Sequence, residues 1–171
     1  MLPKFPQFKK LELSDQIDIE KISSRHLPYS DFNFASMWTW NINDDVKVSE
    51  LNNNLVVVLS DHFTDKPFYS FIGNKELSKT LKQLFAFSMD SNDSAPELKQ
   101  VPEISLDKID LSKYLIEIDL NNSDYVFSLN DLATYQGSKL SNKRKIYHSF
   151  IRTNPEVTIK TFDLKEANYK E

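Results

Sequence analysis

The stretch Leu51-Asn52-Asn53-Asn54-Leu55-Val56-Val57-Val58-Leu59 decides how the first half of the chain folds. Residues 55–59 form the longest apolar run in the sequence, and a short continuous run of this kind is typical of a buried strand. The three asparagines tolerate left-handed backbone, so they predict a hairpin between a strand over 45–50 and a strand over 55–60. A third strand is expected over 68–72.

Helical and strand patterns extend outward from this hairpin. Before it, the sequence predicts a strand over 8–13 and helices over 14–25 and 31–40. The elements predicted after it are an amphipathic helix over 75–89, a strand over 101–106, a helix over 107–114, a strand over 115–120, a turn at 121–122, a short strand-like run over 125–127, helices near 128–135 and 140–153, and a strand over 157–162. The pattern indicates a single mixed α/β domain over residues 1–171, with antiparallel hairpins in its front half.

The composition excludes several kinds of site. The 171 residues include only two glycines, Gly73 and Gly137, which excludes a multi-glycine dinucleotide turn or a Walker loop. The chain has no cysteine, and its three histidines share no metal-ligand spacing, so no metal site and no cofactor are predicted. The formal net charge of −4 argues against a globally basic nucleic-acid binder.

The sequence shows neither a transmembrane segment nor a secretory signal. No run approaches the roughly 20 consecutive apolar residues that a transmembrane helix needs. The opening, Met1-Leu2-Pro3-Lys4-Phe5-Pro6, lacks the apolar stretch of a secretory signal. We therefore expect a cytoplasmic location and no transmembrane segment.

The sharpest local signal is a basic segment near the C-terminus. No acidic residue lies between Leu132 and Pro155. On a helix that begins after Ser141, residues 144, 148 and 152 are spaced four apart and line one side. The candidate phosphate or substrate ligands are Lys139, Lys143, Arg144, Lys145, His148 and Arg152. The alternative is a solvated basic face that offsets an acidic body.

Two further features have a functional and a structural interpretation. In the aromatic helix over 31–40, Phe34 and Trp38 are candidates for a pocket wall or for base stacking, although core packing is the commoner use of such rings. Gly73, between a strand and a helix, marks either a pyrophosphate-binding turn or a simple connection. Tyr29, just before the aromatic helix, and Tyr135 and Tyr147, near the basic segment, are candidate proton donors that nothing ranks above structural tyrosines.

Three sets of stretches have the form of known motifs. Phe5-Pro6-Gln7-Phe8-Lys9-Lys10-Leu11 is similar to F-P-x-F-K-P-L. Tyr29-Ser30 with Phe34-Ala35-Ser36-Met37-Trp38-Thr39-Trp40 is similar to Y-S followed by F-x-N-L-x-x-W. Asp124-Tyr125-Val126-Phe127-Ser128-Leu129-Asn130-Asp131-Leu132-Ala133 with Gly137-Ser138-Lys139 and Asn142-Lys143-Arg144-Lys145 is similar to D-Y-x-Y-x-x-x-D-L-x-x-L-x-G-K-K-x-x-x-K-R-N. Together they resemble the bacterial family related to the C-terminal domain of phosphatidylglycerol lysyltransferase. Arg144 matches the arginine of K-R-N, whereas Lys145 replaces the asparagine.

The resemblance implies a GNAT-like fold, the architecture of acyl-CoA N-acyltransferases, with a mostly antiparallel sheet flanked by helices. It also implies that the chain is the first half of a protein with two GNAT-like domains in tandem. The implied reaction is transfer of an aminoacyl group from aminoacyl-tRNA to a lipid or to another amine or hydroxyl acceptor. The implied partners are aminoacyl-tRNA, a second GNAT-like half or another copy of the chain, and lipid headgroups at a membrane surface. No catalytic residue can be assigned from the motifs.

Two other functions stay open at this point. One is a non-catalytic binding or partner module that acts through the aromatic helix or the basic face. The other is a small CoA-dependent N-acetyltransferase with a degenerate loop at Gly73. The pyrophosphate signature of acetyl-CoA enzymes, R/Q-x-x-G-x-G/A, is missing after residues 68–72, which argues against ordinary acetyl transfer.

Overall fold

The chain is described by a computed structural model over residues 1–61, 64–91 and 96–158. The contacts between its residues divide the chain into two compact units, Met1–Asp124 and Tyr125–Glu171, called unit 1 and unit 2 below. Each unit is described by itself. The expectation of a single domain over 1–171 stays a prediction.

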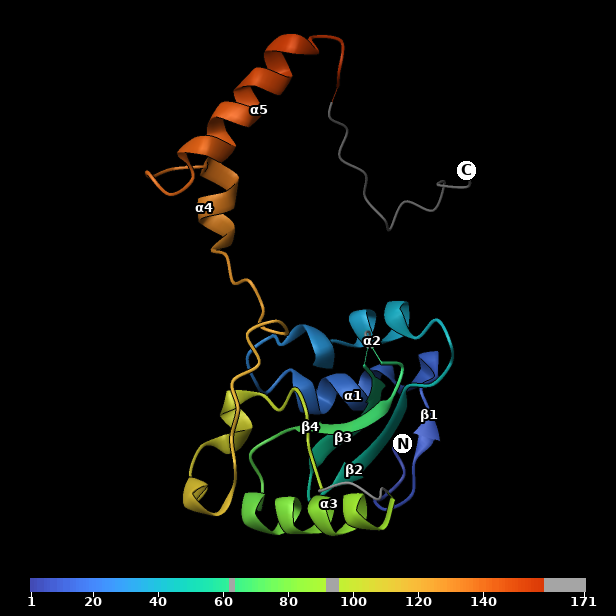
Figure 1. Cartoon of the computed structure of the whole chain (residues 1–171). Coiled ribbons are helices and arrows are strands. Elements are labelled where there is room, and N and C mark those ends of the chain that lie inside the picture. The colour runs from blue at the N-terminus through green and yellow to red at the C-terminus, as the bar shows by residue number, and fades with distance from the viewer. Residues whose placement is uncertain (62–63, 92–95, 159–171) are drawn as a thin grey trace. The chain divides into compact units, whose positions relative to one another are not determined.

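Unit 1 is built on a four-stranded antiparallel sheet (Figure 1). Its strands follow the order of the chain, β1 (Lys9–Lys10), β2 (Lys47–Leu51), β3 (Asn54–Ser60) and β4 (Pro67–Ile72). The predicted hairpin is confirmed, because Leu51 pairs with Asn54 and the two residues between them have left-handed φ angles of 52° and 63°. Such a two-residue turn matches the natural twist of the strands that it joins.

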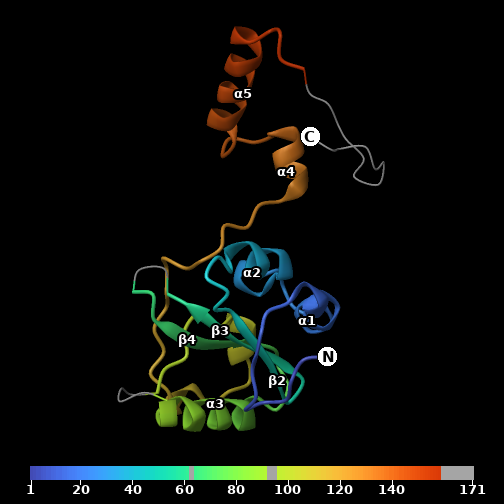
Figure 2. The ribbon, with the colours of Figure 1, turned by 90° about the vertical axis from the view of Figure 1, so that its right-hand side faces the viewer.

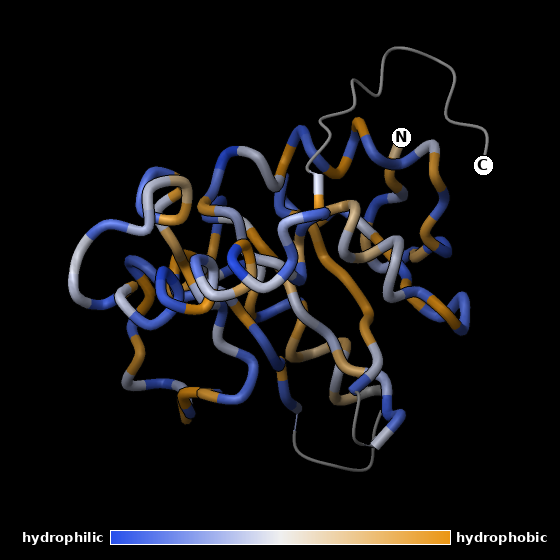
Figure 3. Tube along the Cα trace, turned by 90° about the horizontal axis from the view of Figure 1, so that it is seen from above, coloured by the Kyte–Doolittle hydropathy of each residue, from blue (hydrophilic) through white to orange (hydrophobic). Residues whose placement is uncertain are grey.

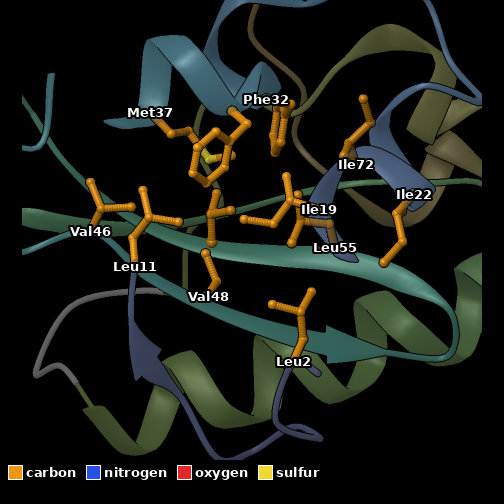
Figure 4. Close-up of a cluster of buried hydrophobic side chains, with 12 residues drawn as sticks. Leu2, Leu11, Ile19, Ile22, Phe32, Met37, Val46, Val48, Leu55 and Ile72 are labelled. Atoms are coloured by element: carbon orange, nitrogen blue, oxygen red, sulfur yellow. The ribbon is translucent and has the colours of Figure 1, made fainter. Parts of the chain in front are cut away.

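Helices cover both faces of this sheet (Figures 1 and 2). On one face lie α1 (Gln16–Ser23) and α2 (Phe34–Trp40), and on the other lies α3 (Leu77–Ser91). Successive side chains of a strand point to opposite faces, so β3 contributes to two separate cores. Leu55 and Val57 join the cluster under α1 and α2 (Figure 4), whereas Val56 packs with Leu81 and Leu84 of α3. The run of residues 55–59 is therefore apolar throughout because helices cover the strand on both sides.

The predicted strands behind α3 are wrong wherever the structure describes them. Residues 101–106 hold a short 3-10 helix over Glu103–Leu106, and the predicted helix over 107–114 shrinks to one 3-10 turn over Leu111–Lys113. Residues 115–120 and 125–127 form no strand. Apolar alternation needs a neighbouring strand to bond to, and the four-stranded sheet contains no strand from these segments.

The predicted strand over 157–162 is absent at 157 and 158, and its remaining residues lie outside the described part of the chain. The turn at 121–122 is confirmed, since the Asp119 carboxylate accepts the backbone N–H groups of Asn121 and Asn122 at 3.1 and 3.2 Å. Hydrophobic and hydrophilic residues alternate along most of the chain trace (Figure 3). In the described ranges, no helix is long and apolar enough to cross a membrane.

A fully buried asparagine connects the hairpin to the turn that follows β4. The Asn54 side chain donates to the Lys75 carbonyl at 2.8 Å and to the Thr80 hydroxyl at 3.1 Å, and its oxygen accepts the Lys75 N–H at 3.0 Å. Gly73 packs directly on the Asn54 carboxamide, with φ of +145°, and donates its own N–H to the buried Ser105 hydroxyl at 3.1 Å. All the hydrogen-bonding capacity of the Asn54 amide nitrogen is used, so burial of this polar group is stabilising.

This contact predicts a large effect of Gly73→Ala. A Cβ at position 73 would overlap the Asn54 carboxamide and would force an L residue into a φ that only glycine adopts readily. We expect the free energy of unfolding of unit 1 to fall by about 2–4 kcal/mol. Urea unfolding followed by tryptophan fluorescence measures it, because Trp38 and Trp40 both lie in unit 1.

Gly137→Ala is the matched control for that measurement. Gly137 also has a positive φ, of +84°, but a Cβ added to it would meet no atom within 4 Å, and it lies in unit 2. We expect no change in the transition that the tryptophans report. An equal loss of stability in both variants would show that the tryptophan transition does not isolate unit 1, which would contradict the assignment of the effect to the Asn54 contact.

His26 predicts a pH dependence of stability. Burial, with the charges of Arg25 and Lys75, lowers the pKa of His26 below its usual value of 6.5. The unfolded chain therefore takes up this proton at a higher pH than the folded chain, so the free energy of unfolding falls as the pH drops through about 6.5. His26→Gln should flatten the stability profile between about pH 7.5 and 5.5, whereas His148→Gln, in unit 2, should leave the tryptophan-reported profile unchanged.

Candidate functional site

Unit 2 contains the two helices that the sequence predicts there. They are α4 (Leu129–Thr134) and α5 (Ser141–Thr153), joined by a short turn (Figure 1). The Ser128 hydroxyl caps α4 by accepting the Asp131 N–H at 3.3 Å, and the helix ends at Tyr135, whose φ of 49° is left-handed. Gly137, with φ of +84°, continues the reversal toward α5. Glycine adopts such a φ without steric cost.

Arg144 holds this turn closed. Its Nη1 group donates to the carbonyl of Tyr135 and, at 3.4 Å, to the carbonyl of Gly137. The last carbonyls of a short helix have no partner inside the helix, so a cation that bonds them stabilises the helix end. The sequence predicts that Arg144 is an anion ligand. In the structure its side chain also stabilises the turn through these two hydrogen bonds. A guanidinium has five N–H donors, so one nitrogen held by carbonyls leaves others for a ligand.

Within residues 125–158, the cations other than Arg144 have no acidic partner among the described residues. Among the residues that the structure describes, every salt bridge joins two groups of unit 1. Unit 1 has 13 lysine and arginine residues against 20 aspartate and glutamate residues, a formal charge of −7, whereas residues 125–158 have five against two, a charge of +3. Lys139, Lys143, Lys145 and Arg152 are exposed. Positive charge is therefore concentrated on residues 125–158, with no ion pair to neutralise it among the described residues.

Only some of the predicted ligands lie together. Arg144 and His148 line one cavity of about 230 Å³ with Tyr135 and Tyr147, while Lys139, Lys143, Lys145 and Arg152 are outside its lining. The two tyrosine rings are 6.0 Å apart between centroids, and the rings of Tyr147 and His148 are 5.4 Å apart. Sequence patterns place both tyrosines near the basic segment without assigning them to a cavity. The left-handed turn at residue 135 brings the two tyrosines together, and the hydrophobic periodicity of the sequence does not predict this turn.

Two amides of the turn after β4 are used inside the protein and are not presented to a ligand. The N–H groups of Gly73 and Lys75 donate inward, to Ser105 and Asn54. A pyrophosphate site needs such amides to point outward. A cavity of about 190 Å³ lies beside this turn, and its lining includes the acidic Asp107 as well as the basic Lys108. The geometry therefore gives no support to a CoA grip at Gly73.

The aromatic helix mainly serves the core of unit 1. Phe34 is 4% exposed and belongs to the cluster between α1, α2 and the sheet. Trp38 stacks on it, with ring centroids 6.2 Å apart, and remains 43% exposed. A pocket wall made by these two residues stays a prediction. In the described ranges, no group of histidine, aspartate and glutamate side chains could hold a metal ion.

Two motif segments that are far apart in the sequence meet in unit 1. The backbone N–H of Ser30 donates to the Asp124 carboxylate at 2.9 Å, and the Ser30 hydroxyl donates to it at 2.6 Å. This contact joins the start of the aromatic helix to the end of unit 1 across 94 residues. Sequence reasoning predicted no contact between the two residues, although both stand in the quoted motifs.

Comparison with known proteins gives one family. The family model described as "Phosphatidylglycerol lysyltransferase, C-terminal" matches residues 24–171. The matched range takes in Ser30, Asp124 and all of α4 and α5, whereas the motif over 5–11 lies outside it. No curated protein and no solved structure matches the chain at a significant level.

The Arg144 bonds predict that Arg144→Ala loosens unit 2. Loss of the guanidinium leaves the Tyr135 and Gly137 carbonyls to water, and we expect the opening free energy around the turn to fall by about 1 kcal/mol. Amide hydrogen exchange across residues 129–153 measures the change. Lys143→Ala removes the same charge from an exposed position and is the control; equal exchange in the two variants would contradict the structural role of Arg144.

Proposed function

The chain belongs to the phosphatidylglycerol lysyltransferase C-terminal family, and on that premise we propose that it is an aminoacyltransferase domain that binds aminoacyl-tRNA through unit 2. The family supports the coarser description, a domain related to aminoacyl transfer. The proposed acceptor is a lipid or another molecule with an amine or hydroxyl group. Aminoacyl-tRNA is made in the cytoplasm, so we place the proposed reaction there.

The observation that carries the proposal is the set of cations in residues 125–158 that have no acidic partner among the described residues. RNA offers one phosphate charge per nucleotide, and cations that meet these phosphates release condensed counterions, which favours binding. Unit 1, with its charge of −7, would repel the same RNA. The charge distribution therefore favours unit 2 as the RNA contact, with Lys139, Lys143, Lys145 and Arg152 as phosphate ligands and Arg144 shared between ligand and turn.

The proposed reaction needs no oxidant and no metal. The amine or hydroxyl of the acceptor attacks the ester carbonyl carbon of the aminoacyl-tRNA, forming a new amide or ester bond. The ester bond to the terminal ribose then breaks, and the proton lost by the acceptor is taken up by the released ribose oxygen. Holding the two substrates in the right geometry supplies a large part of the rate in such transfers.

The proposed fold is GNAT-like, with this chain as one half of a tandem pair. The antiparallel sheet of unit 1, covered by helices on both faces, is compatible with this architecture. A second GNAT-like half, or another copy of the chain, would then supply the acceptor site and the donor that stabilises the oxyanion of the tetrahedral intermediate. No residue of the described ranges is assigned to that oxyanion.

A second candidate function is a partner-binding module without catalysis. The observation that favours it is the exposure of apolar side chains on unit 2, whose helices contain no buried residue. Ile146 is 57% exposed and Phe150 is 49% exposed. Short helices gain most of their stability from packing, so a partner surface that covers these side chains would stabilise unit 2.

Replacing three of the unpaired cations tests the RNA contact. In Lys143→Ala/Lys145→Ala/Arg152→Ala, we expect the affinity for a tRNA to fall at least about tenfold, because three phosphate contacts are lost. The slope of log affinity against log salt should become shallower by about 2, at roughly 0.7–0.9 per contact. A filter-binding series over salt concentration measures both. Arg144 is kept, so that the turn between α4 and α5 stays intact.

The matched control is Lys47→Ala/Lys66→Ala/Lys82→Ala, three exposed lysines of unit 1 with the same total charge change. We expect this variant to bind tRNA with nearly unchanged salt dependence. An equal loss in both variants would show that net charge, rather than a site on unit 2, determines binding. A wild-type chain that binds no tRNA at low salt would overturn the proposed function.

A further inference from the structure

The cavity between α4 and α5 has the features of a site for one flat, negatively charged ligand. We propose that it binds an unpaired nucleobase, with the phosphate of the same nucleotide held by neighbouring cations. This inference rests on the proposed function, since it specifies which part of an RNA unit 2 would hold. Nothing in the family description assigns the cavity a ligand.

Aromatic rings from both sides of the turn form the stacking surface. Tyr147 comes from α5 and Tyr135 from the end of α4, and their rings are tilted by 37°. Tyr147 is 43% exposed, so part of its ring is open to solvent. An unpaired base can stack on such a face whatever its identity, because every base has a π surface.

The size of the cavity limits the ligand. Its volume of about 230 Å³ lies below the roughly 300–1,000 Å³ typical of sites for drug-sized molecules. One planar ring system is a suitable occupant, whereas a bulky cofactor is not. The lining contains no carboxylate, which disfavours a cationic ligand.

The charge of the cavity selects an anion. Arg144 lines it, and only its Nη1 has hydrogen-bond partners within the part of the chain that the structure describes. Its Nε and Nη2 groups are therefore available to a phosphate oxygen, which a guanidinium recognises with paired N–H donors. Lys143 and Lys145 flank Arg144 in the first turn of α5 and add positive charge beside it. Planar aromatic faces combined with an unneutralised guanidinium suit a nucleotide.

The base must be unpaired to use this site. In a duplex, both faces of a base are covered by its stacked neighbours, and the deep groove of an RNA helix excludes side chains. A single-stranded segment or end exposes a free face. A free nucleotide has the same chemistry, so the two sources are separated by experiment.

Replacement of Tyr147 in the full chain is the decisive variant. We measure fluorescence anisotropy with a labelled ten-nucleotide single-stranded oligoadenylate, with a blunt RNA hairpin stem, and with unlabelled AMP as competitor. Tyr147→Leu should weaken binding of the single strand about tenfold or more, since one stacked base is lost. Binding of the hairpin stem should change less than about twofold, and the salt slope for the single strand should stay the same because the phosphate contacts remain.

Two matched variants separate stacking from folding and from the hydroxyl. Phe150→Leu removes an aromatic ring from the same helix at a position outside the cavity lining, and should leave binding of the single strand unchanged. Tyr147→Phe keeps the ring without its hydroxyl and should bind like the wild type. Amide hydrogen exchange across α5 checks that Tyr147→Leu keeps the helix.

The outcomes distinguish this inference from the proposed function. Displacement by AMP at micromolar concentration would support the nucleobase site and identify a free nucleotide as its ligand; displacement by the single strand alone would identify RNA. If the wild type binds both RNAs and Tyr147→Leu binds the single strand equally well, the nucleobase site is overturned and the phosphate contact survives. If the wild type binds neither RNA but binds phosphatidylglycerol vesicles, with Phe150→Leu weakening that binding as much as Tyr147→Leu, both are overturned in favour of a lipid surface.

Discussion

The packing of Gly73 against the buried Asn54 side chain is the contact on which the rest of unit 1 depends. Asn54 begins β3, a central strand that contributes Leu55 to one hydrophobic cluster and the next residue, Val56, to the other. Its carboxamide also holds the backbone of Lys75 and the hydroxyl of Thr80, so it sets where α3 begins relative to the sheet. A side chain at residue 73 would push this amide away. One unsatisfied amide in this position would cost about as much as a well-packed apolar residue contributes.

The same contact decides what the turn cannot do. In a phosphate-binding turn after a strand, backbone amides point to the ligand. Here the amides of Gly73 and Lys75 point to Ser105 and Asn54, so the protein uses them for its own core. The scarcity of glycine therefore has a structural consequence beyond the missing motif. Here one glycine is enough, because it lets the Asn54 side chain approach the backbone of the turn closely. A loop that wraps around a phosphate needs several glycines, because several residues must leave their backbone N–H groups accessible to the ligand.

The two units differ in the sign of their charge, and this difference makes unit 2 the candidate site for a negatively charged ligand. The lysines of unit 1 that pair do so with nearby carboxylates, as Lys9 does with Glu12 and Asp15. In the described part of unit 2, the cations have no such partners. One of them, Arg144, donates its side-chain hydrogen bonds to two carbonyls of the turn and also lines the cavity. The exposed apolar side chains of α5 indicate in addition a surface that a partner would cover.

Local patterns alone determined the asparagine hairpin, the helices over 75–89, 128–135 and 140–153, and the basic segment, because these depend on residues close together in the sequence. They also predicted the strands over 101–106 and 115–120 wrongly, because a strand exists only where another strand can bond to it. Tertiary structure decided three things that no local pattern encodes. It joined Ser30 to Asp124, closed the Gly73 turn with Asn54, and brought Tyr135, Arg144 and Tyr147 to one cavity. The physical reason is that each contact joins groups whose backbone positions depend on the packing of separate elements, and residue type alone does not specify that packing.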